Sequence, residues 1–167
     1  MGIVLLAFIV TAFAGISGCA STGRSMFVQS EAPDAATVQG RWLKESFYVW
    51  EGYSLLSVDD KFISLGLFAD PHNATTRVDP GTRWLVVKAV FNRGFQTGPF
   101  EAYVALYTEL KPLTSYEISG KISGVLVEVW LEDSSSKERL TEVGVAGYSR
   151  QPPAPALIPI FVPIHYK

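Results

Sequence analysis

The sequence has a single cysteine in 167 residues, and this residue, Cys19, precedes the long patterned part of the chain. The patterned part therefore cannot form an intrachain disulfide or a thiolate zinc site. The only histidines are His72 and His165, and no Gly-x-Ser-x-Gly or similar nucleophile setting accompanies them. We therefore predict no metal, no cofactor and no catalytic residue, and we expect the protein not to be an enzyme.

An excess of one charge is also absent. There are 14 basic and 16 acidic residues, for a formal net charge of −2. Phosphate binding needs clustered positive charge, so we predict that nucleic acid is not a partner. Glu101, Glu109 and Glu128 alternate with apolar residues, which is typical of the solvated face of a strand rather than of a glycosidase carboxylate pair.

A long apolar run without charge occurs near the start of the chain, over residues 3–18. It is short for a membrane-spanning helix, which needs about 20 such residues. It ends in small residues, the pattern of a secretory signal and its cleavage site. A short uncleaved anchor and a buried apolar helix are alternative interpretations of the same run.

The end of this run, Ile16-Ser17-Gly18-Cys19, resembles the lipobox of bacterial lipoproteins, in which an aliphatic and two small residues precede a cysteine that becomes diacylated. The resemblance implies that residues 1–18 are a removed signal peptide and that Cys19 carries a lipid. It also implies attachment to a membrane of the cell envelope. Ala20 resembles the neighbours of outer-membrane lipoproteins, so we expect an outer-membrane protein facing the periplasm or the surface.

The remaining chain divides into three parts by composition. Residues 19–40 are rich in Ser, Thr, Ala and Gln and predict a lipidated tether, although Asp34 could cap one short helix. Residues 41–150 contain short β-prone runs separated by turn residues, which predicts an all-β domain. We expect a single small antiparallel β-sandwich of about seven strands. Residues 151–167 contain five prolines and predict an extended tail, lying across the domain or reaching a partner.

Two runs give the clearest strand patterns. Between Phe100 and Leu110, the residues Ala102, Val104 and Leu106 fall on one face, as expected of a half-buried strand. The run from Arg83 to Phe91 is apolar on both faces, which predicts a central strand covered on both sides.

Three segments resemble successive signatures of PEGA-like surface β domains, over roughly residues 55–131. They are Val58-Asp59-Asp60-Lys61, Val78-Asp79-Pro80-Gly81-Thr82-Arg83-Trp84-Leu85-Val86-Val87 and Leu113-Thr114-Ser115-Tyr116-Glu117-Ile118. Asp60 replaces the glycine that the family prefers. The resemblance implies a non-catalytic module of the envelope or cell surface and identifies no functional residues.

Aromatic residues mark a candidate binding face. On a strand, Tyr48 and Trp50 share one face, while Tyr103 and Tyr107 share the face of Glu101 in theirs. Exposed together, these rings would form a platform for a protein partner or for sugar rings. The alternative is that they are buried beneath the N-terminal segment or the tail.

Taken together, these features predict a lipid-anchored, non-catalytic envelope protein whose β domain binds or scaffolds another envelope component. A carbohydrate- or peptidoglycan-binding module that uses the exposed aromatic residues is the alternative function. A hydrolase with an unrecognised site is the third hypothesis.

Overall fold

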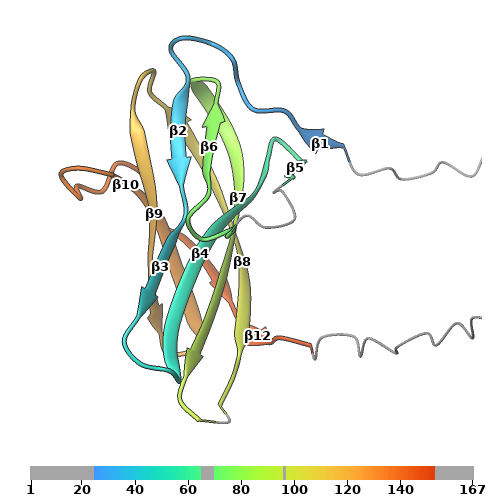
Figure 1. Cartoon of the computed structure of the whole chain (residues 1–167), viewed down its shortest axis with the longest axis vertical. Helices are drawn as coiled ribbons and strands as arrows, with labels where there is room; N and C mark the ends of the chain where they lie inside the picture. Colours follow the sequence, from blue (N-terminus) through green and yellow to red (C-terminus); the bar gives the residue numbers. More distant parts are fainter. Residues whose placement is uncertain (1–24, 65–69, 96, 153–167) are drawn as a thin grey trace, which may run out of the picture.

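The computed structural model describes residues 25–64, 70–95 and 97–152, and every regular element in these ranges is a strand (Figure 1). The strands are β1 (Met26–Phe27), β2 (Ala36–Gln39), β3 (Arg41–Lys44), β4 (Val49–Val58), β5 (Lys61–Ile63), β6 (Thr75–Val78), β7 (Gly81–Arg93), β8 (Phe100–Leu110), β9 (Ser115–Ser123), β10 (Leu126–Asp133), β11 (Gly144–Gly147) and β12 (Ser149–Arg150). The predicted signal peptide, Cys19 and residues 153–167 of the tail lie outside the described residues.

The strands form two sheets that pack into a sandwich-like domain. The first sheet has the order β1-β5-β4-β7-β8-β12, with β3 also paired to β4, and the second has the order β11-β10-β9-β2-β6. β5 pairs with the end of β4 at Ser57 and Val58, whereas β3 pairs with its beginning. The β1–β5 and β2–β9 pairs are parallel, so the sandwich is not wholly antiparallel.

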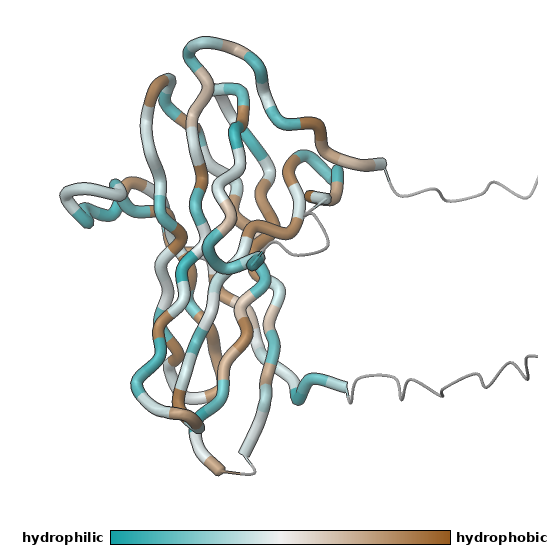
Figure 2. The backbone as a smooth tube through the Cα atoms, in the orientation of Figure 1, coloured by the Kyte–Doolittle hydropathy of each residue, from teal (hydrophilic) through white to brown (hydrophobic). Residues whose placement is uncertain are grey.

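The core forms where the alternating faces of the two sheets meet. In β8, Ala102, Val104 and Leu106 are buried, which confirms the predicted face. In β10, Val127 and Val129 are fully buried in the same way from the other sheet. Figure 2 shows hydrophobic segments recurring along the strands, with hydrophilic segments between them. Burial of this interlocking apolar surface is the main stabilising contribution to the fold.

The outer face of the first sheet is not covered in the described residues. β7 is central, between β4 and β8, as the sequence predicts. Its inward residues Leu85 and Val87 are fully buried, but Trp84 on the opposite face is 43% exposed. Within the described residues this strand is covered on its inward side only, and its other side forms a partly exposed apolar surface.

Two details of the predicted organisation also change. The described residues contain twelve strands, whereas the sequence predicts about seven. Many of the twelve have only two to four residues, and strands this short carry almost no alternating pattern. The predicted tether also includes β2, where Ala36 and Val38 are fully buried in the core. No helix follows Asp34, because pairing with β6 and β9 outweighs the local capping preference.

The chain crosses from the second sheet to the first at Gly40, between β2 and β3. A Cβ atom on Gly40 would lie 2.6 Å from the His72 carbonyl oxygen and 2.8 Å from that of Tyr53. Only glycine allows this close approach. The crossing brings Trp42 of β3 opposite Gly52 of β4. Within the ranges given above, the chain forms no helix of the length and apolarity required to cross a membrane.

Candidate binding surface

Two stacked indole rings lie on the outer face of the first sheet. The antiparallel pairing of β3 with β4 places Lys44 opposite Trp50 and Trp42 opposite Gly52, so both tryptophans project to the same side. The ring centroids of Trp42 and Trp50 are 5.0 Å apart with an interplanar angle of 22°. Because Gly52 has no side chain, the Trp42 ring lies directly over the strand, where a Cβ atom would be only 2.5 Å from its Cε3 atom.

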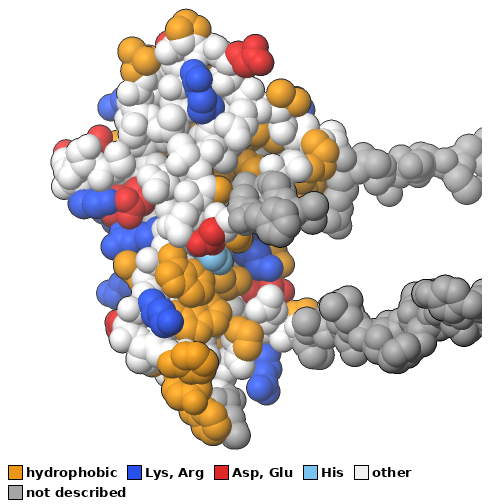
Figure 3. Space-filling model, in the orientation of Figure 1, with side chains coloured by type: hydrophobic (Ala, Val, Ile, Leu, Met, Phe, Trp, Pro, Cys, Tyr) orange, Lys and Arg blue, Asp and Glu red, His pale blue; other side chains and the backbone are white. Residues whose placement is uncertain are grey.

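Three more aromatic side chains extend this surface around the β3–β4 turn. Phe47 contacts Tyr48 edge to face at 5.0 Å between centroids, and Tyr48 contacts Phe95 at 5.2 Å. Their exposed fractions are 76%, 44% and 65%. We call the set Trp42, Phe47, Tyr48, Trp50 and Phe95 the aromatic surface. It forms much of the hydrophobic area in the lower half of Figure 3.

A groove continues from the aromatic surface along β4 and β7. Its volume is about 320 Å³, within the range of small-ligand and peptide sites. It is lined by Trp42, Trp50, Ser54, Leu55, Leu56, Ile63, Pro71, His72, Lys88, Val90 and Gln151. We call it the outer groove. Most of this lining is apolar, so the groove suits an apolar ligand better than a charged one.

Charge in the outer groove is largely neutralised within the protein. The Lys88 ammonium lies 3.0 Å from the Glu101 carboxylate and 5.5 Å from the centroid of the Tyr103 ring. Partial burial acts to lower the pKa of Lys88, but its hydrogen bond to Glu101 and the nearby Tyr103 outweigh burial and leave this pKa above its usual range. Lys88 therefore stays protonated and paired.

His72 is half-buried at the edge of the groove. Its ring lies 4.8 Å from that of Trp42, and its buried Nδ1 atom has no hydrogen-bond partner among the described residues. Burial lowers the pKa of His72 below 6.5, although Asp70 acts to raise it. The Asp70 carboxylate accepts hydrogen bonds from the His72 backbone N–H and from the Asn73 side chain, so it fixes the turn.

The structure separates the predicted site residues into two groups. Tyr48 and Trp50 belong to the aromatic surface, whereas Tyr103 lies over Lys88 and is 50% exposed. Tyr107 is 71% exposed and lies beside Trp84, 6.2 Å between centroids. Trp50 pairs with Asn92 of β7, whereas Tyr103 and Tyr107 pair with Lys88 and Trp84 of the same strand. Both tyrosines therefore lie at least four residues further along the sheet than Trp50. The four residues therefore share a sheet face but not one platform.

Sequence reasoning missed Trp42 and Phe95. The alternation of Arg41, Trp42, Leu43 and Lys44 is a weak strand signal that could have placed Trp42 on the same face as Lys44. Phe95 follows the end of β7 in a loop, where no periodic pattern operates. Its contact with Tyr48 depends on the pairing of β4 with β7, which brings the two loops together.

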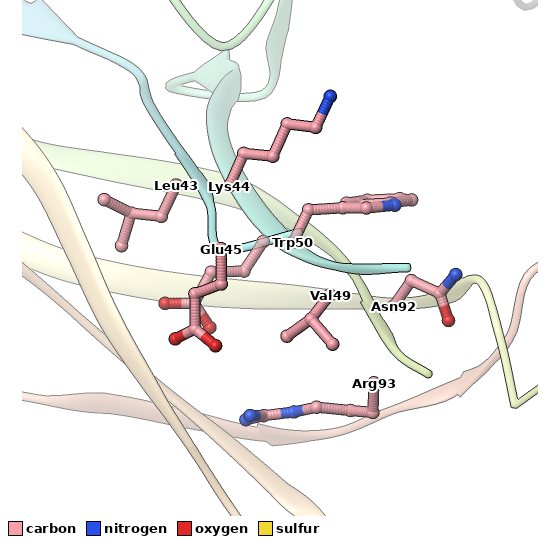
Figure 4. Close-up of a pocket in the computed structure, with 8 residues that line it drawn as sticks. Leu43, Lys44, Glu45, Val49, Trp50, Asn92 and Arg93 are labelled. Carbon is pink, nitrogen blue, oxygen red and sulfur yellow. The ribbon is translucent and has the colours of Figure 1, made fainter. Parts of the chain in front are cut away.

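A second, smaller cavity of about 200 Å³ opens at the same end of the domain. It is lined by Leu43, Lys44, Glu45, Val49, Trp50, Glu51, Asn92 and Arg93. Figure 4 shows that Lys44 and Trp50 project to one side of the hairpin, while Leu43 and Glu45 project to the other. This volume is below the roughly 300 Å³ at which small-molecule sites begin.

Burial sets the electrostatics of the groups in and next to this smaller cavity. Burial raises the pKa of the Glu51 carboxyl above its usual range, although Arg93 and Arg41 act to lower it. Burial also raises the pKa of the Tyr53 hydroxyl, so this group remains protonated. The residues that line the cavity include no serine, cysteine or histidine to act as a nucleophile or base beside Glu51. Of the charged residues in the lining, Lys44, Glu45 and Arg93 are exposed and only Glu51 is partly buried.

In the part of the chain that the structure describes, no three His, Cys, Asp or Glu side chains are grouped closely enough to hold a metal ion. Comparisons with protein-family models, with curated proteins and with solved structures found no match for this chain. The aromatic surface and the outer groove therefore have to be interpreted from their own geometry.

Proposed function

We propose that this chain is a lipid-anchored, non-catalytic protein of the bacterial cell envelope, and that its β domain binds another envelope protein through the aromatic surface. The observation that carries the proposal is the cluster of five aromatic side chains, Trp50 among them, that the described residues leave partly exposed. Tryptophan and tyrosine dominate many protein interfaces, because they bury a large area while few bonds lose rotation. Exposed apolar clusters in a folded domain typically mark binding faces.

The membrane part of the proposal rests on the sequence. The tetrapeptide that ends at Cys19 resembles a lipobox, and it follows an apolar run of the length of a signal peptide. Two acyl chains on this cysteine would provide stable attachment, at about 0.8 kcal/mol per buried methylene. Mass spectrometry of the chain purified from its native host should find an acylated N-terminal Cys19. An intact Met1 together with a free thiol would overturn the anchor.

Protein is favoured over glycan as the ligand because of the groove lining. Trp42 and Trp50 could each stack on a sugar ring, and this specific feature keeps a carbohydrate, including peptidoglycan, as the second candidate. Sugars, however, also need many hydrogen bonds to their hydroxyl groups, and the groove supplies mainly apolar side chains. Its one lysine, Lys88, is already paired with Glu101.

The proposal can be tested by crosslinking the full chain in intact envelopes and purifying it by affinity. Trp50→Ala should lower the yield of the specific partner about tenfold, the usual effect of removing a central aromatic contact. Trp84→Ala is the matched control, because Trp84 is exposed on the same sheet face but lies outside the aromatic surface and groove. Equal recovery with both variants would refute the proposed role. Loss of sedimentation with purified peptidoglycan in Trp50→Ala alone would favour the glycan.

A further inference from the structure

The last strand brings the chain to the outer groove. β12 pairs with Phe100 and Glu101 of β8 at the edge of the first sheet (Figure 1). Beyond it, the Gln151 backbone N–H donates a hydrogen bond to the Pro99 carbonyl oxygen at 2.9 Å. Gln151 itself lines the outer groove together with Trp50 and Lys88. The described part of the chain therefore ends at Pro152, one residue beyond a residue that lines this groove.

The chemistry of residues 153–167 suits the same groove. Their sequence is Pro-Ala-Pro-Ala-Leu-Ile-Pro-Ile-Phe-Val-Pro-Ile-His-Tyr-Lys, without a charged residue before Lys167 when histidine is neutral. Proline-rich chains favour the extended polyproline II conformation, which has three residues per turn and no internal hydrogen bonds. Grooves lined by aromatic side chains bind such chains, because the proline rings pack on aromatic faces at little cost in chain entropy.

Length and charge are also compatible. At about 3.1 Å per residue, residues 153–167 could extend about 46 Å. The part of β4 between Ser54 and Trp50 measures about 14 Å at 3.4 Å per residue. The segment is therefore long enough to follow the groove and then cross the aromatic surface. The pairing of Lys88 with Glu101 means that an apolar chain would not cover an unpaired lysine there.

We propose that residues 153–167 of this chain occupy the outer groove and the aromatic surface, and that they must leave before a partner binds. The inference rests on the proposed function for the existence of a competing partner. It also names the class of that partner, which presents an extended, proline-rich apolar segment to the same rings. Because the segment is attached directly beside the groove, its effective concentration there is on the order of millimolar, so even weak contacts keep it bound.

Site-specific photocrosslinking in the full-length chain tests the occupancy. With benzoylphenylalanine in place of Phe161, irradiation should give an intramolecular crosslink to peptides that contain Trp42 or Trp50. Trp50→Ala should lower the yield about tenfold, whereas Trp84→Ala should leave it nearly unchanged. Circular dichroism and urea unfolding of each variant establish that it is folded before its yield is compared. The absence of a crosslink in the folded parent, or an equal loss in both variants, would overturn the proposal. A crosslink between two chains would also overturn it, by assigning the groove to a second copy.

A second variant separates this inference from the proposed function. Replacing Pro155 and Pro159 by serine in the full chain should weaken docking, lower the crosslink and raise recovery of the partner about tenfold. If the crosslink is absent while partner capture still depends on Trp50, the segment is not the occupant and the proposed function stands. If the crosslink depends on Trp50 but no partner is captured, the groove serves only its own chain and the proposed function fails.

Discussion

Substitution of Gly52 by alanine gives a direct test of how the aromatic surface is built. A Cβ atom at this position would lie 2.5 Å from Cε3 of Trp42 and 2.7 Å from Nδ1 of His72. Real Cβ contacts do not fall below 3.0 Å, so one or both rings must move by several tenths of an ångström or more. Trp42 is 37% exposed and can swing outward, away from Trp50 and His72.

The expected cost follows from the ring contacts that this movement removes. Trp42 makes two ring contacts, and each is worth about 0.5 to 1.5 kcal/mol beyond its buried area, so their loss costs about 2 kcal/mol. Replacement of glycine lowers the entropy of the unfolded chain and returns about 0.5 to 1 kcal/mol. We therefore expect Gly52→Ala to lower the free energy of unfolding by about 1 kcal/mol.

Gly147→Ala provides the matched control in a strand. The nearest atom to a Cβ there is the Val125 carbonyl oxygen at 4.0 Å, so alanine fits without displacing a neighbour. Urea unfolding should place Gly147→Ala about 0.5 kcal/mol above the parent and about 1.5 kcal/mol above Gly52→Ala. Near-ultraviolet circular dichroism should show a weaker tryptophan signal only in Gly52→Ala. Equal stability of the two variants with unchanged spectra would refute this account of the stacked rings.

Two further predictions concern charge and pH. Arg41 joins the two sheets, since its guanidinium lies 3.0 Å from the carboxylate of Glu132, which is only 6% exposed. We expect Arg41→Met to lower the free energy of unfolding, measured in urea, by about 2 to 3 kcal/mol, because it leaves a buried carboxylate without its partner. The double variant Arg41→Met, Glu132→Gln should recover part of this loss of stability. A cost of Arg41→Met below about 0.5 kcal/mol would contradict this role. Burial holds the pKa of His72 in the folded chain below 6.5, so the unfolded chain binds a proton on this imidazole first as the pH falls. The free energy of unfolding should therefore decrease as the pH falls from 6.5 towards the pKa of His72 in the folded chain. His72→Gln should flatten that part of the pH profile, and an unchanged slope would show that another group is responsible.

The long strands could be predicted because their patterns are local. β8 runs from Phe100 to Leu110, the limits that its alternation predicts. The turn at Asp59 and Asp60 was also predictable, because aspartate tolerates positive φ better than most residues. Both residues have positive φ in the structure. Asp59 adds a contact that the sequence does not reveal, because its carboxylate accepts a hydrogen bond from the Trp84 backbone N–H at 3.0 Å.

The composition of the aromatic surface could not be predicted in the same way. Tyr48 and Trp50 were identifiable because they belong to one run, but Trp42 joins them only through the register of β3 against β4. Register is set by pairing between strands and by the turn, not by either strand alone. Phe95 depends on a loop at the end of β7, and β2 carries too few residues to outweigh the tether-like composition around it. Tyr107 was grouped with Trp50 because both alternate outward, but alternation does not give distance along a sheet.

The placement of β1 and β12 at opposite edges of the first sheet has a mechanical consequence. Each has only two residues, and the described residue next to each makes a backbone hydrogen bond, from Phe62 N–H to the Ser25 carbonyl oxygen and from Gln151 N–H to that of Pro99. Tension at either end would peel these short strands, breaking their hydrogen bonds in succession rather than together. The long central strands β4, β7 and β8 would keep their pairing while the ends yielded, so stretching would lengthen the chain before it unfolded the core.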